Sequence, residues 1–291
     1  MKTYSFRLLN VFAESIFGGN PLCVFEDAEG LRDEQMQALA LQFNLSETSF
    51  ILPSDKANAR MRIFTTGYEM RFAGHPTLGT AHVVRDLMGG KDSLSLECLA
   101  GVVQVEARQD HWVFTAPSDG NPVMTVPGLP AEDIAAMLGL EADDLSASPV
   151  WVNTGTDQLL VPLKSAAAVR RAQPDSSRLE QWPQSSLGRK TAYVFAFDEE
   201  NSSAGQEIQV LSRYFFVRKG GGVVEDPGTG SACANLGGWW IASDQELPAR
   251  LSVSQGEQVQ RPSRLSLEVT ADRQIRVGGR VLEIGRGTVT V

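Results

Sequence analysis

The chain has 291 residues, a formal net charge of −9 and an ordinary composition, with 42% hydrophobic and 8% aromatic residues. This length predicts two domains of roughly 100–150 residues, each large enough for its own core. The acidic balance and scattered basic residues argue against a nucleic-acid surface and an anionic-membrane surface. No window approaches the roughly 18 continuous apolar residues of a membrane span.

Cysteine usage and the first residues bear on the compartment. The three cysteines, Cys23, Cys98 and Cys233, are an odd number spread widely along the chain. This spacing is typical of reduced thiols rather than of a disulfide framework. The chain also begins with a strand-like pattern that lacks an apolar signal core. We therefore expect a cytoplasmic protein.

Alternating apolar and β-branched residues dominate the first part of the chain. They predict strands at residues 6–12, 22–25, 49–52, 61–65, 93–97, 102–107 and 112–115. Helical periodicity appears at 32–43 and again at 77–88, directly after Pro76. The first part is thus expected to be a sheet with few helices.

Residues 116–130 hold four prolines and two glycines and mark the predicted domain boundary. We expect one domain at 1–117 and another at 118–291, with the final strand able to return to the first domain. The second part is predicted to contain helices at 131–138, between 165 and 180, and at 230–242, and strands at 150–152, 158–163, 192–197 and 209–217. The tail 264–291 alternates like three strands with a turn at Gly278-Gly279.

Two segments, 62–81 and 213–232, match one another without a gap, and a titratable residue precedes the matched proline in each: His75 and Asp226. Each segment leads from a strand into a helix. Glycines let the backbone approach a ligand closely, and a helix N-terminus attracts anions by about 0.3–1 kcal/mol at exposed sites. The repetition predicts a duplicated fold whose two loops clamp a carboxylate in one cleft.

Each candidate also has an ordinary structural interpretation. Asp226 could be the N-cap of a proline-started helix, and Glu47 could be an exposed turn acid. Glu47 lies between a predicted helix and a predicted apolar strand. Desolvation there could raise the pKa of its carboxylate toward the pH at which it both accepts and returns a proton. His82 and His111 have no such context, so we expect them to be structural.

Competing chemistries lack their motifs. The chain has no phosphate-binding Gly-Lys-Ser/Thr loop, no dinucleotide-binding glycine motif after a strand and no Gly-x-Ser-x-Gly elbow. Its histidines and cysteines are not spaced as zinc ligands. We therefore expect no nucleotide cofactor and no metal.

Four segments resemble the signature stretches of the phenazine-biosynthesis PhzF-like family. They are Gly18-Gly19-Asn20-Pro21, Ser46-Glu47-Thr48-Ser49-Phe50, residues 71–81 and residues 225–232. The resemblance implies an α+β, diaminopimelate epimerase-like fold of two pseudo-symmetric domains. Each domain would be a curved, mostly antiparallel sheet around a central helix, with the active site between the two domains. It also implies a homodimer that uses no cofactor.

The resemblance also implies residue roles. Glu47 corresponds to the proton-transferring glutamate, with His75 and Asp226 as its catalytic support. The implied substrate-binding residues are Gly74, Gly230 and Ser231. Related epimerases carry a thiol on each loop, where this chain has Ala73 and Pro227, and Cys233 is expected to be a small core residue.

The resulting hypothesis is a cofactor-independent isomerase that moves a proton within a small, cyclic, amino-bearing carboxylate. One alternative is an amino-acid epimerase or racemase, which would need a second base on the opposite face of the substrate. Another is a non-catalytic member that binds a small molecule or a protein. The presence of Glu47, His75 and Asp226 together favours catalysis, because a binder needs no base.

Overall fold

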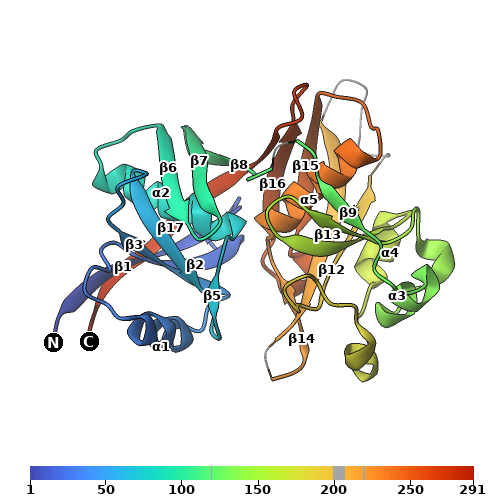
Figure 1. Ribbon diagram of the computed structural model, residues 1–291, viewed down its shortest axis with the longest axis horizontal. Coiled ribbons are helices and arrows are strands. Elements are labelled where there is room, and N and C mark those ends of the chain that lie inside the picture. The colour runs from blue at the N-terminus through green and yellow to red at the C-terminus, as the bar shows by residue number, and fades with distance from the viewer. Residues whose placement is uncertain (119, 199–206, 219) are drawn as a thin grey trace. The chain divides into compact units, whose positions relative to one another are not determined.

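The computed structural model describes residues 1–118, 120–198, 207–218 and 220–291 (Figure 1). The chain divides into two compact units. Unit 1 comprises Met1–Pro117 together with Arg276–Val291, and unit 2 comprises Ser118–Ile275. The last segment of the chain therefore belongs to the first unit.

The strands of unit 1 form a closed circuit. They are β1 (Thr3–Val11), β2 (Asn20–Phe25), β3 (Glu47–Leu52), β4 (Ala59–Phe64), β5 (Glu69–Met70), β6 (Ser93–Cys98), β7 (Gly101–Arg108), β8 (His111–Thr115) and β17 (Ile275–Thr290). Pairing runs β17-β1-β2-β3-β4-β6-β7-β8 and returns to β17. The β2–β3 and β4–β6 pairs are parallel and the others antiparallel. Closure leaves no edge exposed along this circuit.

Helix α2 (Gly74–Leu87) occupies the centre of this circuit and packs against β1, β2, β3, β4, β6, β7 and β8 (Figure 1). Gly79 lets it approach closely, since a Cβ there would lie 2.4 Å from Cδ2 of Leu22. Pro76 falls in the first turn, where its missing N–H costs no helical bond. Helix α1 (Asp33–Phe43) covers an aromatic cluster that includes Phe25 and Phe50.

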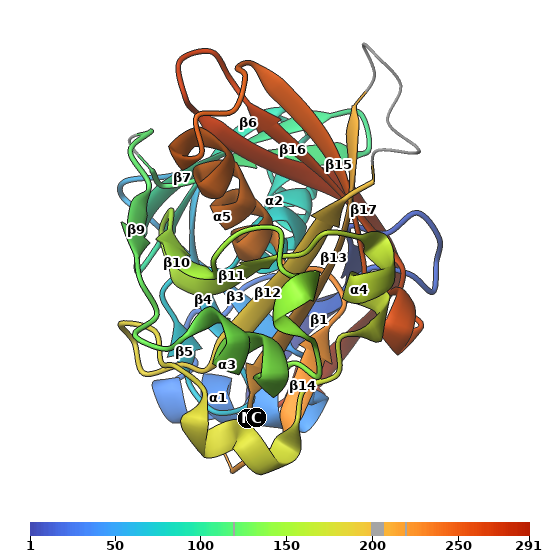
Figure 2. The ribbon, with the colours of Figure 1, turned by 90° about the vertical axis from the view of Figure 1, so that its right-hand side faces the viewer.

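Unit 2 repeats this plan. Its strands are β9 (Val123–Thr125), β10 (Val150–Asn153), β11 (Asp157–Pro162), β12 (Thr191–Phe197), β13 (Ile208–Val217), β14 (Val223–Asp226), β15 (Ala249–Gln255) and β16 (Ser263–Val269). Its helices are α3 (Ala131–Met137), α4 (Ala166–Arg171), α5 (Gly230–Ala242) and the 3-10 turns η1 (Ala142–Asp144), η2 (Ser176–Gln181) and η4 (Glu257–Val259). Helix α5 packs against β9, β10, β11 and β16 (Figure 2).

The two units have matching strand orders. In each, an antiparallel pair (β1–β2, β10–β11) is followed by a parallel neighbour (β3, β12) and an antiparallel one (β4, β13). A short hairpin strand and a central helix come next, and then another parallel strand (β6, β15). The expected duplicated α+β fold is confirmed.

The gapless match of the two segments is wrong. Phe64 lies opposite Glu69 in one hairpin, and Phe215 lies opposite Glu225 in the other, so the second hairpin is five residues longer. The central helix begins five residues after the glutamate in both units. His75 therefore corresponds in position to Ser231. The sequence match fails because the glycines at 220–222 belong to the longer hairpin.

The turn expected at Gly278-Gly279 is also wrong. Strand β17 runs through both glycines, and Gly278 pairs with Val113 of β8. A Cβ at Gly278 would lie 2.7 Å from the carbonyl oxygen of Trp112, so close strand packing explains this glycine. The reversal before β17 occurs at 270–274, where Arg273 has a φ of 64°.

The three cysteines are free and buried, and burial raises the pKa of the Cys23 and Cys233 thiols. Cys233 is a core residue of α5, as expected. Within the described ranges, no three His, Cys, Asp or Glu side chains gather as a metal site would require. No described helix is both long enough and apolar enough to cross a membrane.

Candidate active site

Glu47 and His75 meet at the N-terminal end of α2. Glu47 is the first residue of β3 and pairs with Leu22 of β2, while His75 is the second residue of α2. Oε2 of Glu47 lies 3.4 Å from Nε2 of His75. The two side chains are 15% and 5% exposed, respectively. The structure thus brings together two of the residues that the sequence singled out.

Burial keeps the His75 ring neutral. Desolvation lowers its pKa to about 3, against the opposing effect of a hydrogen bond to the backbone of Pro21. Proline has no N–H, so the Pro21 carbonyl accepts from the ring. Nε2 has no hydrogen-bond partner among the described residues, so we assign the donated proton to Nδ1. The Nε2 lone pair therefore faces the Glu47 carboxyl group.

The sequence motifs of unit 1 also contribute the residues that position Glu47 and His75. Gly19 has a φ of 74°, and a Cβ there would lie 2.5 Å from the carbonyl oxygen of Val11, so only glycine allows the tight return into β2. That return places the Pro21 carbonyl against His75. One turn further along α2, the hydroxyls of Ser49 and Thr80 lie 2.7 Å apart and tie β3 to the helix.

Asp226 ends β14 and is held by a closed loop in unit 2. Thr229 Oγ1 donates to Asp226 Oδ2 at 2.5 Å. The buried Gln255 amide donates from Nε2 to the Asp226 carbonyl at 2.8 Å and to Thr229 Oγ1 at 3.0 Å. Its Oε1 accepts from the Thr229 N–H at 3.3 Å. Thr229, and not Asp226, occupies the N-cap position of α5, so the capping interpretation of Asp226 is wrong.

Gly230 and Ser231 form the first turn of α5, and Gly74 occupies the same place in α2. The first helical bond of α5 runs from the Cys233 N–H to the Thr229 carbonyl. The preceding N–H groups thus have no acceptor within the helix and point along its axis, a geometry that anion-binding helix starts share. Ser231 Oγ accepts from Nε2 of Gln158 at 2.8 Å.

Sequence reasoning missed Gln158 and Gln255. Each is a single glutamine on a strand, β11 or β15, and no local pattern distinguishes it from a surface residue. Thr229 lies inside the motif at 225–232 but was not singled out. Their burial, at 3% and 0% exposed, is visible only in the folded strands, so the sequence held no signal that could have found them.

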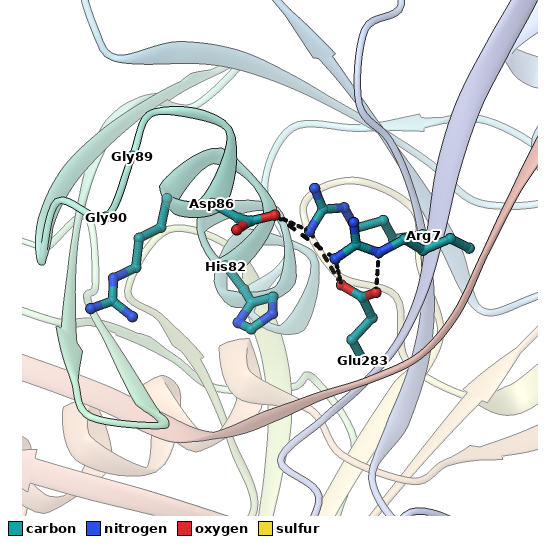
Figure 3. Close-up of a pocket in the computed structure, with 8 residues that line it drawn as sticks. Arg7, His82, Asp86, Gly89, Gly90 and Glu283 are labelled. Atoms are coloured by element: carbon teal, nitrogen blue, oxygen red, sulfur yellow. Dashed lines mark hydrogen bonds and ion pairs between the residues drawn. The ribbon is translucent and has the colours of Figure 1, made fainter.

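A cavity of about 330 Å³ lies toward the other end of α2, lined by Arg7, His82, Arg85, Asp86, Gly89, Gly90, Glu283 and Arg286 (Figure 3). The buried Arg7 contacts Glu26 at 2.5 Å, Asp86 at 2.7 Å and Glu283 at 3.2 Å. It thereby links β1 to the residue that follows β2, to α2 and to β17. The arginines of this cavity are all ion-paired, so we assign it a structural role.

A family model described as phenazine biosynthesis-like protein (PhzC-PhzF) matches residues 9–287. The chain belongs to the PhzF family. An uncharacterized isomerase of Pasteurella multocida is 39% identical over 99% of this chain and 94% of its own length. The trans-2,3-dihydro-3-hydroxyanthranilate isomerase of Pseudomonas aeruginosa is 34% identical over 90% of this chain and 89% of its own length. This PhzF-family member is therefore an isomerase, as the sequence predicted.

Solved structures support the same assignment. A PhzF-family protein of Bacillus anthracis matches with a TM-score of 0.82 and 26% identity, covering 100% of both chains. A hydroxyproline epimerase of Agrobacterium vitis matches with a TM-score of 0.58 and 12% identity, over 99% of this chain and 91% of the other. The second likeness shows the shared epimerase-like fold alone.

Proposed function

We propose that this PhzF-family isomerase moves a proton within a small, cyclic, amino-bearing carboxylate, with Glu47 removing the proton and returning it to another ring carbon. The observation that carries the proposal is the buried pair of Glu47 and neutral His75. A proton that leaves one carbon and re-enters at another, with the double bonds shifting between them, balances without any second reactant.

The neutral state of His75 suits this role. A permanent imidazolium beside Glu47 would hold the carboxylate in its ionised form and weaken it as a base. The uncharged ring instead offers a lone pair that can accept a hydrogen bond from the protonated carboxyl group. His75 can therefore support Glu47 in the state that stores the proton.

We assign substrate binding to the loop and first turn of α5. Asp226 carries a carboxylate suited to an amino group, and its orientation is fixed by Thr229. The N–H groups of Gly230 and Ser231, with the Ser231 hydroxyl, suit a carboxylate. Gly74 provides the corresponding helix start in unit 1. We also propose that the protein acts as a homodimer without a cofactor.

The first substrate to test is trans-2,3-dihydro-3-hydroxyanthranilate, the compound in the name of the Pseudomonas relatives. Turnover should be followed by NMR for the wild type, Glu47→Gln and a control, Glu34→Gln, at an exposed position of α1. We expect turnover by the wild type and the control only. A Glu47→Gln protein with full turnover would overturn the proposal.

Turnover in deuterated water separates this reaction from epimerisation. An epimerase would introduce deuterium at a stereocentre and leave the double bonds in place. The proposed isomerase would change the position of the double bonds, with solvent deuterium appearing only at the carbon that receives the proton. Deuterium at the original carbon without a shift of double bonds would favour the epimerase alternative.

A further inference from the structure

A connected set of buried polar groups in unit 2 ends at Ser231. The Thr154 N–H donates to Asn235 Oδ1 at 2.9 Å. Asn235 Nδ2 donates to Gln158 Oε1 at 2.6 Å, and Gln158 Nε2 donates to Ser231 Oγ at 2.8 Å. Asn235 is fully buried, and Gln158 and Ser231 are nearly so. The set joins β11 to the first two turns of α5.

The backbone groups that contact Asn235 fix the direction of every hydrogen bond in this set. A backbone N–H can only donate, so Asn235 must turn its oxygen toward Thr154. Its Nδ2 also donates to the backbone carbonyl of Thr156 at 2.8 Å, which can only accept. Gln158 must therefore turn its oxygen toward Asn235 and its NH2 group toward Ser231.

The fixed orientation of Gln158 determines how the Ser231 hydroxyl can bind, because a hydroxyl has one proton and two lone pairs. One lone pair accepts from Gln158. The hydroxyl proton is left to donate to another partner, and the described residues supply none that competes for it. At the start of α5, this proton adds to the N–H groups of the first turn, which favour the same kind of ligand atom.

We propose that Gln158 and Asn235 are positioning residues that fix Ser231 as a hydrogen-bond donor, which makes it specific for an acceptor oxygen, the substrate carboxylate. The inference rests on the proposed function because it takes Ser231 to contact the substrate. It adds a reason for specificity: a ligand that presents a donor group to Ser231 meets a second donor and loses the hydrogen bond.

The decisive variant is Gln158→Glu, which keeps the side-chain shape but replaces the NH2 group with an oxygen. The new carboxylate can still accept from Asn235, but it also accepts from Ser231 and so turns the hydroxyl proton away from the ligand. The probes are 2-aminobenzoate, titrated calorimetrically into the full chain, and trans-2,3-dihydro-3-hydroxyanthranilate, titrated into the full chain that also carries Glu47→Gln so that the compound is not turned over. We expect Kd to rise about 10–100-fold in Gln158→Glu and about as much in Ser231→Ala.

A double-mutant cycle separates an effect that acts through the Ser231 hydroxyl from simple repulsion of the ligand by the new carboxylate. If Gln158→Glu acts through Ser231, the double variant should bind no more than about 3-fold more weakly than Ser231→Ala alone. A full additive loss in the double variant would mean charge repulsion and would overturn the inference. Thermal unfolding of Gln158→Glu should occur at a lower temperature than in the wild type, because the new carboxylate is buried without a cation, so binding is measured well below that temperature.

Other outcomes also decide the matter. An unfolding temperature lowered by many degrees with an unchanged Kd would make the set purely structural and overturn the inference. Absence of saturable binding of both carboxylates by the proteins that retain Gln158 and Ser231 would do the same. Binding also separates this inference from the proposed function: Glu47→Gln tests turnover, whereas the cycle at Gln158 and Ser231 tests recognition and holds even if the reaction differs.

Discussion

The starts of α2 and α5 are the same place in two copies of one fold. In each unit an arginine of the long hairpin strand, β4 or β13, makes a bidentate ion pair with a glutamate of the short one, β5 or β14. The pairs are Arg62 with Glu69 and Arg213 with Glu225. The helix begins five residues after that glutamate. The second residue of the helix is His75 in one unit and Ser231 in the other.

These two residues present opposite hydrogen-bonding character. His75 donates its proton to the Pro21 carbonyl and shows a lone pair to Glu47. Ser231 accepts from Gln158 and is left with a proton to donate. Duplication thus kept the frame and its ion pair while the chemistry at the helix start diverged, which suits proton transfer in unit 1 and oxyanion binding in unit 2.

The largest effect should come from removing Glu47, the proposed proton carrier. Glu47→Gln keeps the shape of the side chain but cannot take up a proton, so kcat should fall about 10²–10⁴-fold, the usual contribution of a general base. Steady-state kinetics on the identified substrate would measure it, with Glu34→Gln as the matched control. A fall in substrate affinity at unchanged kcat would assign Glu47 to binding and would contradict the contrast between proton transfer in unit 1 and oxyanion binding in unit 2.

The two arginine–glutamate pairs should differ in their contribution to stability. Arg213→Met leaves the nearly buried Glu225 carboxylate without its cation and frees carbonyls at the end of α4, which should cost about 3–5 kcal/mol. Arg62→Met should cost about 1–2 kcal/mol, because Glu69 is more exposed and Asp33 is largely solvated. Denaturant unfolding would measure both. Equal costs would contradict the difference in burial.

His75 should make stability depend on pH. Its pKa is about 3 in the folded state and near 6.5 when unfolded. Its contribution is complete above pH 6.5 and is lost as the pH falls toward 3, because only the unfolded chain binds the proton there. The loss is at most about 1.4 kcal/mol per pH unit. In His75→Asn the acid limb of unfolding free energy against pH should flatten by this amount, and parallel curves would refute a neutral buried ring.

The smallest effect should come from the helix position that Gly79 occupies in unit 1. Gly79→Ala gains about 1 kcal/mol of helix propensity but forces a Cβ against the buried Leu22, at about 1–3 kcal/mol. We expect a net loss of about 1 kcal/mol by thermal unfolding. Gly285→Ala on β17 is the control, since no atom lies within 4 Å of its added Cβ. Equal stability of the two variants would show that α2 can shift within the closed circuit of strands and so accommodate the added Cβ.

Local patterns in the sequence were enough to predict most elements, whereas the joint roles of Glu47 and His75 were implied by the family resemblance. Helix α5 was expected at 230–242 and lies there, because Gly228 and Gly230 mark its start and its apolar run ends before the polar residues 243–246. Glu47 and His75 could be found because each stands in a motif where a strand or helix begins. Glu47 and His75 come into contact because the start of β3 and the start of α2 lie at the same end of the unit 1 strand circuit.

Long-range features could not be predicted in the same way. The shift between the repeats depends on hairpin length, and glycines in a hairpin look the same as glycines in a ligand loop. Gly278 is explained by the carbonyl of Trp112, which is distant in sequence. The role of Gln158 depends on which way Asn235 faces, and only the folded backbone around Thr154 decides that.

The most direct test of the central claim is to measure kcat and Kd separately for Glu47→Gln and Ser231→Ala on the same carboxylate substrate. A division of labour between proton transfer and oxyanion recognition predicts that Glu47→Gln loses kcat about 10²–10⁴-fold while Kd changes little. It predicts that Ser231→Ala raises Kd about 10–100-fold with a much smaller change in kcat. The reverse pattern, or equal losses of both constants in both variants, would contradict it.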